Sequence, residues 1–265
     1  MIPYAPWVDP RLSRKPGTLP LDPADWIESG PDRATQMAYR KHLIAGERDT
    51  VFAALPEGAT AQAELLDILA AHLGVLPPRT DEPPLLIAGR LVQEDFCLMQ
   101  QRAPGEEYRL TAAILCFPSR WSLAEKIGRP LTAIHDPVPE YGDDLAKRVN
   151  RLFDGIRADR PLWRANWTIH PTDELFLPSG EIRENAPGGG ALFIRVERQT
   201  FLRLPRTGAV VFGIRTHVDP LDALSSAEAA ALHAALAERT AEETAYRGGG
   251  DLHAAAMASL AARAA

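Results

Sequence analysis

The 265-residue chain contains only two cysteines, Cys97 and Cys116, and this scarcity excludes several kinds of metal chemistry. Two thiols cannot ligate an iron–sulfur cluster that needs four thiolates, nor an all-cysteine zinc site. The sequence also lacks Cys-x-x-Cys-His, which excludes a covalently attached c-type haem. Both cysteines lie within apolar runs, so we expect them to pack in the core as small hydrophobic side chains.

The seven histidines and the glycines lack the spacings of several common functional motifs. No two histidines follow the His-x-x-x-His or His-Glu-x-x-His pattern that places two zinc ligands on one helix face. The sequence contains no Gly-x-Gly-x-x-Gly, so a doubly wound dinucleotide-binding sheet is not expected. The nucleophile elbow of serine hydrolases, Gly-x-Ser-x-Gly, is absent as well.

Long apolar runs and an excess of basic residues are also missing. No apolar stretch approaches the length of a membrane span, and the first residues lack the basic and apolar regions of a signal peptide. Lys plus Arg number 29 against 35 for Asp plus Glu, a net charge of -6, which argues against nonspecific binding to nucleic acid or anionic membranes. We therefore expect a cytoplasmic protein that binds neither nucleic acid nor membrane.

The order of the expected elements predicts an α+β fold. Residues 1–30 contain six prolines, which break long helices, and two of the five tryptophans, so we expect an extended arm packed over the rest. We expect residues 31–265 to form a single domain, in which strands stand between two groups of helices, an order typical of antiparallel α+β sheets. Helices are predicted over 32–52 (with Asp32 as cap), 61–73, 143–158, 222–246 and 251–264, with a short one begun by a capping box of Ser122 and Glu125. Strands are predicted over 91–100, 110–117, 162–169 and a hairpin at 191–216.

The predicted hairpin carries an arginine in an apolar stripe. Alternation places Arg198 on the same face as Ile194 and Val196, where it needs an anionic partner. That partner is either a bound carboxylate such as a propionate or a structural carboxylate of the protein, and the strand alone leaves both open. An even-length loop brings Gly213, Arg215 and His217 to the Arg198 face, whereas a three-residue loop reverses them. Gly213 would admit a flat ligand or another backbone, or mark a bulge. Glu197 points to the opposite face.

His135 differs from the other histidines in its surroundings. It lies in residues 131–139 (LTAIHDPVP), where two prolines stiffen the chain directly after it. A single positioned imidazole suits a haem axial ligand, a general base or a capped core histidine.

Several segments, taken in order, resemble one known family. They are residues 117–121 (FPSRW), 134–139 (IHDPVP), 166–167 (NW), 195–200 (RVERQT), 203–205 (RLP) and 212–216 (FGIRT). Together they resemble the haem-binding alpha subunit of the haem-dependent oxidative N-demethylase family, which is dimethylamine monooxygenase-like. The resemblance extends over roughly residues 30 to 240.

The resemblance implies a fold, a cofactor and a reaction. The fold is a PAS-like antiparallel sheet that holds haem b. The reaction is the O2-dependent oxidative demethylation of a small secondary amine such as dimethylamine, which yields formaldehyde and the primary amine. Its electrons come from a separate partner, a reductase or ferredoxin-type donor that carries the NAD(P)H, flavin and iron–sulfur sites.

The resemblance also implies roles for individual residues. His135 is the expected axial ligand of the haem iron. If haem binding does not depend on His135, we expect His170 or His217 to be the ligand. Arg198 and Arg215 are expected in the pocket, where they bind propionate or act at the oxygen site. Further expected haem contacts are Arg120, Trp121 and Trp167.

Two other functions remain open on the sequence. A PAS-like sheet is a common sensor scaffold, and fold does not fix function, so a haem-based sensor or gas-binding module without turnover is the first alternative. The second is a haem-free member that only binds a partner, an interpretation that His135 and a buried Arg198 disfavour.

Overall fold

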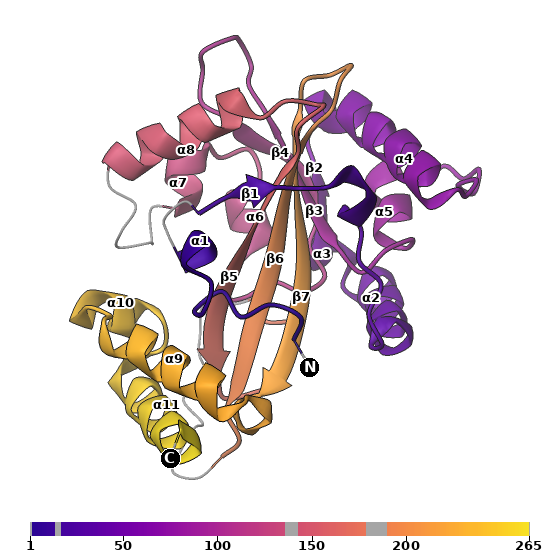
Figure 1. Cartoon of the computed structure of the whole chain (residues 1–265). Coiled ribbons are helices and arrows are strands. Elements are labelled where there is room, and N and C mark those ends of the chain that lie inside the picture. Colours follow the sequence, from indigo (N-terminus) through magenta and orange to yellow (C-terminus); the bar gives the residue numbers. More distant parts are fainter. Residues whose placement is uncertain (1, 14–16, 136–142, 179–189, 265) are drawn as a thin grey trace.

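The computed structural model describes residues 2–13, 17–135, 143–178 and 190–264 (Figure 1). Its centre is a seven-stranded antiparallel sheet in the order β1-β5-β6-β7-β3-β4-β2, with helices around it, and this confirms the α+β prediction. The strands are β1 (Leu19–Pro20), β2 (Phe52–Ala54), β3 (Asp95–Gln100), β4 (Arg109–Ile114), β5 (Leu162–His170), β6 (Phe193–Arg203) and β7 (Val210–Pro220). The helices are α1 (Pro10–Ser13), α2 (Arg33–Gly46), α3 (Arg48–Val51), α4 (Ala59–Leu73), α5 (Pro84–Gly89), α6 (Leu123–Lys126), α7 (Leu131–His135), α8 (Asp143–Gly155), α9 (Ser226–Ala237), α10 (Ala241–Tyr246) and α11 (Gly249–Ala264).

Several element boundaries differ from the sequence prediction, each for a local reason. The helix predicted over 32–52 is interrupted at Glu47, and its last residue, Phe52, begins the edge strand β2. The helix predicted over 222–246 is divided because Thr240 forms a capping box with Glu243 and starts α10. The capping box predicted at Ser122 is wrong, since its side chain makes no cap hydrogen bond to α6. The sequence prediction missed α5, which begins with proline at its first helical position.

The long hairpin of β6 and β7 divides the sheet's side chains into two sets. Arg198 pairs directly with Arg215 and Thr200 with Gly213, so these side chains share one face, as the even-length loop predicted. We call this side the arm face. The side that carries Arg195, Glu197 and Gln199 we call the α8 face.

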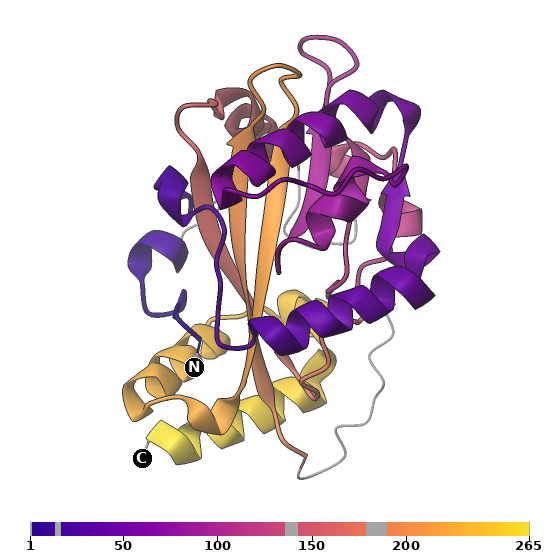
Figure 2. The same cartoon turned by 90° about the vertical axis from the view of Figure 1, so that its right-hand side faces the viewer.

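Different elements cover the two faces. The arm face packs against α2, α4 and α5 at one end, and against the N-terminal residues, α9 and α11 at the other. In Figure 2, α2 and α4 lie in front of the long strands, and the C-terminal helices lie at their lower end. The α8 face packs against α6, α7 and α8 at the end of β6 near Phe201.

The proline-rich N-terminal residues lie across the sheet. The backbone N–H of Leu21 donates to Pro161 O at 2.9 Å beside β1, and the indole of Trp7 donates to Glu228 O at 3.1 Å on α9. Trp7 and Trp26 are both buried, as expected of anchors. The division into an arm and a single domain from residue 31 stays a prediction.

The two cysteines are buried and free, as expected from their apolar surroundings. Burial raises the pKa of the Cys116 thiol to about 12 and raises that of Cys97 as well, so neither offers a thiolate near neutral pH. Within the described ranges, every helix is too short or too polar to traverse a bilayer.

Candidate functional site

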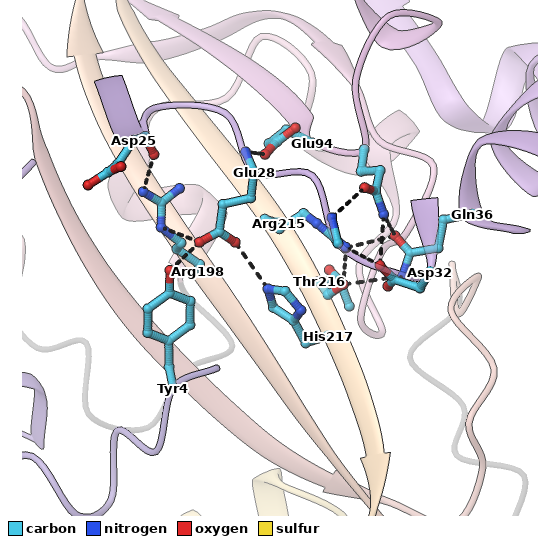
Figure 3. Close-up of polar contacts among 12 residues, drawn as sticks. Tyr4, Asp25, Glu28, Asp32, Gln36, Glu94, Arg198, Arg215, Thr216 and His217 are labelled. Carbon is cyan, nitrogen blue, oxygen red and sulfur yellow. Dashed lines mark hydrogen bonds and ion pairs between the residues drawn. The ribbon is translucent and has the colours of Figure 1, made fainter. Parts of the chain in front are cut away.

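Arg198 on the arm face is held by the N-terminal residues. Its guanidinium donates to the backbone oxygens of Asp25 at 2.5 Å and Trp26 at 3.2 Å, and its Nε lies 3.2 Å from Glu28 Oε1 (Figure 3). The same guanidinium lies 5.6 Å from the centre of the Trp163 ring. These contacts connect the arm to β6.

Arg215, the neighbour of Arg198 across the hairpin, is held by α2. Its side chain is fully buried and donates to Asp32 Oδ1 and Gln36 Oε1, each at 2.7 Å. The Asp32 side chain therefore binds an arginine. The sequence had predicted that it caps α2, but it makes no cap hydrogen bond to that helix. Although partial burial opposes ionisation of Asp32, the Arg215 hydrogen bond and charge hold the pKa of that carboxyl below its ordinary value.

Two glutamates continue this network. Glu28 Oε2 lies 3.2 Å from His217 Nε2, and Glu28 also accepts a hydrogen bond from the Tyr4 hydroxyl (Figure 3). The Glu28 N–H donates to Glu94 Oε1 at 2.8 Å, whereas Glu94 Oε2 is buried without a hydrogen-bond partner among the described residues. Burial raises the pKa of Glu94 to about 7.

Gly213 on the arm face makes room for protein atoms. A Cβ at this position would lie 2.5 Å from Thr200 Oγ1 and 3.5 Å from the Phe96 ring. The pairing of β6 with β7 runs without a shift through this position, so the bulge alternative is wrong. The partners of Arg198 and Arg215 are those of structural arginine–carboxylate pairs, and their assignment to a ligand pocket stays a prediction.

The α8 face carries a half-buried surface beside α7. Four apolar side chains there pack against the α6–α8 cluster without being fully buried: Trp121, Leu162, Phe212 and Ile214. We call these four residues the floor. Farther along the strands, Arg164, Asn166 and Glu197 are also half-buried, and next to Glu197 the buried hydroxyl of Thr216 has no hydrogen-bond partner among the described residues. An apolar surface next to charged groups is the usual composition of a ligand site.

Arg195 anchors two loops to this face. It is 1% exposed, donates to Phe117 O at 2.5 Å and to Leu175 O at 3.3 Å, and its Nε lies 3.4 Å from Glu197 Oε1. The loop after Phe117 holds Arg120 at φ 56°, a left-handed conformation that non-glycine residues seldom adopt. The Arg120 N–H donates to Leu177 O at 2.7 Å, which fixes this turn.

The structure separates the residues that the resemblance placed together. Arg120 and Trp121 lie by the α8 face, whereas Trp167 lies on the arm face, 5.9 Å from the Trp7 ring and 4.3 Å from the Arg239 guanidinium. His135 is the last residue of α7, and its side chain lies outside the described part of the chain.

The two alternative histidine ligands both have polar neighbours at Nε2. His217 Nε2 lies beside Glu28 on the arm face. His170, on the α8 face, has its Nε2 2.9 Å from Thr168 Oγ1 and 3.4 Å from Ser119 Oγ. Burial, together with the charges of Arg195 and Arg120, lowers the pKa of His170 to about 3, so its imidazole is neutral at physiological pH.

Sequence reasoning named Arg120 as a candidate on the α8 face but missed Arg164, Arg195 and Arg247. Arg195 and Glu197 share their motif with Arg198, and strict alternation already places both on the opposite side. Arg164 lies in the middle of an apolar strand, the same signal that drew attention to Arg198. Arg247 follows α10 in a glycine-rich stretch and carried no such signal.

The fold and this face define a helix-flanked antiparallel sheet with a partly open, arginine-rich side. A family model described as haem-dependent oxidative N-demethylase, alpha subunit-like, matches residues 74–257, well over half of the chain. The chain therefore belongs to this family, as its motifs suggested. The description names a haem-dependent oxidoreductase and an alpha subunit, so it implies a bound haem and partner subunits.

Proposed function

We propose that the protein catalyses oxidative N-demethylation of a small secondary amine such as dimethylamine with haem b as cofactor. In this reaction dimethylamine, O2, two electrons and two protons give methylamine, formaldehyde and water. The observation that carries the proposal is the half-buried floor on the α8 face, in a chain of this family. The PAS-like character of the sheet and a cytoplasmic location, which suits two free thiols, belong to the same proposal.

The residues present fit a haem. The group is a flat apolar macrocycle with two carboxylates at one edge, and the α8 face offers an apolar floor with arginines beside it. We propose His135 as axial ligand, because α7 packs on the same apolar cluster as the floor. Arg120 and Trp121 are proposed contacts. We do not extend the proposal to Trp167, Arg198 or Arg215, which lie on the arm face and have protein partners.

When bound, haem supplies the reduction and activation of O2, for which side chains have no equivalent. The chain itself would provide the apolar surface that excludes water from the macrocycle, the imidazole of His135 as a ligand for the iron, and a neutral His170 beside Ser119. We propose that the two electrons come from a separate reductase or ferredoxin-type partner, which would carry the NAD(P)H, flavin and iron–sulfur sites.

An absorption spectrum tests the cofactor. The protein is expressed with added haem beside His135→Ala and the control His42→Ala, whose side chain is exposed on α2. We expect a Soret band in the wild type and in His42→Ala, and its loss or shift in His135→Ala. Absence of haem uptake by the wild type would overturn the proposal. Uptake unchanged in His135→Ala would transfer the axial role to His170, tested in the same way with His170→Ala.

Turnover tests the reaction. The haem-loaded protein is given dimethylamine, O2 and a reductase with NADH, and formaldehyde is measured against amine consumed. We expect one formaldehyde for each dimethylamine. Reversible binding of O2 or carbon monoxide without formaldehyde would instead support the gas-binding sensor.

A further inference from the structure

Three arginines near β5, beyond the two residues of β5 that pair with β1, form no ion pair with any described residue. Within the described part of the chain, the side chains of Arg120 and Arg164 form neither a hydrogen bond nor a salt bridge with any residue. Among the residues that the structure describes, the Arg247 guanidinium donates only to the backbone oxygen of Trp167, at 3.2 Å. We call Arg120, Arg164 and Arg247 the arginine cluster. All three are half-buried.

Three separate segments bring the cluster together. Arg164 lies on the α8 face of β5 opposite Gln199, Arg120 lies in the turn between β4 and α6, and Arg247 follows α10. Burial is the main reason that the pKa of each guanidinium is lowered, and for Arg120 and Arg164 the charge of Arg247 lowers it further. Arg247 is therefore within electrostatic reach of both Arg120 and Arg164.

Nearby negative charge does not balance them. Glu197 acts on both Arg164 and Arg247, but it also contacts Arg195 and accepts a hydrogen bond from Gln199 at 3.0 Å. Glu243 acts on Arg247 as well, but its carboxylate accepts the Thr240 N–H in the α10 capping box. Like charges gathered out of water are costly unless an anion joins them. The left-handed backbone of Arg120 is a second costly feature at the same place, and such strain is concentrated at ligand-binding positions.

The anion must be small enough to enter a partly buried site. Guanidiniums that dock an acidic protein surface project into solvent, whereas all three guanidiniums here belong to half-buried side chains. The planar fork of an arginine matches a carboxylate with two parallel hydrogen bonds. A dianion with two carboxylates would therefore satisfy the cluster.

We propose that Arg120, Arg164 and Arg247 bind the two carboxylates of the haem at the edge of β5, while the macrocycle covers the floor. This inference rests on the proposed function. It makes the C-terminal helices part of the cofactor site, because Arg247 joins α10 to α11. It also assigns the cofactor to the opposite face from Arg198 and Arg215.

Haem and its dimethyl ester together test the proposal, since esterification removes the two negative charges and leaves the ring. The haem-free wild type, Arg164→Gln, Arg247→Gln and the control Arg102→Gln, an exposed arginine, are titrated with each compound and followed at the Soret band. We expect each cluster variant to bind haem about tenfold or more weakly, the size of one lost charge-assisted pair. We expect ester binding to be the same in all four proteins, and weaker than haem binding in the wild type.

The outcomes separate this inference from the proposed function. A wild type that binds neither compound overturns both. If the wild type binds haem and ester equally and the cluster variants keep their haem affinity, the arginine cluster does not bind the haem carboxylates. The proposed function is not contradicted by that result. Loss of affinity in Arg102→Gln equal to that in the cluster variants also overturns the cluster. Circular dichroism checks that each variant is folded. If a variant fails to fold, Arg164→Lys replaces it, because lysine keeps the positive charge and lacks the planar fork of the guanidinium. We expect Arg164→Lys to bind haem with intermediate affinity.

Discussion

Two regions of the sheet differ in the partners of their arginines. On the arm face, Arg198 and Arg215 each meet a carboxylate, Glu28 or Asp32, from the N-terminal part of the chain. On the α8 face, Arg195 meets Glu197, whereas Arg164 forms no ion pair with any described residue. A paired arginine holds segments together, whereas an unpaired one leaves binding capacity for a ligand. The location of unbalanced charge, more than the presence of arginine, indicates where the ligand belongs.

Removal of a carboxylate from the arm face should give the largest effect. Glu28→Ala leaves the Arg198 charge buried without its acidic partner, which typically costs about 3 to 5 kcal/mol. Urea unfolding measures the loss, with the exposed Glu57→Ala as control. A loss below about 1 kcal/mol would mean that the backbone oxygens of Asp25 and Trp26 alone satisfy Arg198.

The next largest effect is expected in the pH dependence of the free energy of unfolding, through Glu94 on the arm face. Folded Glu94 keeps its proton up to about pH 7, whereas in the unfolded chain it loses the proton near 4.5. The folded state therefore binds more protons between these values, and this group's contribution falls as pH rises, by about 3 kcal/mol. Glu94→Gln should remove that slope. Unfolding measured from pH 5 to 8 that shows identical slopes in both proteins would contradict the expectation.

His170 on the α8 face should make the free energy of unfolding change with pH in the opposite direction. Its folded pKa of about 3 lies below the ordinary value of 6.5, so only the unfolded chain takes up a proton between them. Stability therefore falls as pH falls below 6.5, by about 2 kcal/mol at pH 5. His170→Gln should flatten this acid limb in a thermal-unfolding series, and an unchanged limb would show that the imidazole is protonated in the folded protein.

The smallest effect is expected in the arginine cluster without ligand. Arg164→Gln removes a charge that forms no ion pair with a described residue and that Glu197 attracts while Arg247 repels it, so the free energy of unfolding should change by less than about 1 kcal/mol. This contrasts with Glu28→Ala and is measured in the same urea series. A large loss of stability would indicate that Arg164 has a structural partner, and Arg164 would then no longer differ from the paired Arg198.

The elements that were predictable from sequence are those with strong local patterns. Helix α4 follows from its apolar spacing and ends at Gly74, which adopts the left-handed conformation. The β6–β7 hairpin follows from two alternating runs, and its even loop placed Arg198 beside Arg215. Strand β2 was missed because three residues at the end of a helix pair with β4 only in the folded sheet. Helix α5 was missed because the proline at its first position was interpreted as the end of regular structure.

By itself, the sequence determined the α+β order, the two sets of alternating side chains and, through its ordered motifs, the family. Those properties are local, or are carried by residues in chain order. Only the tertiary structure decided that Arg198 and Arg215 meet Glu28 and Asp32. It also decided that the arginine cluster converges without an ion pair to any described residue. The physical reason is that an arginine's partner is set by which distant segment packs over its face of the sheet, and alternation along a strand carries no information about that cover.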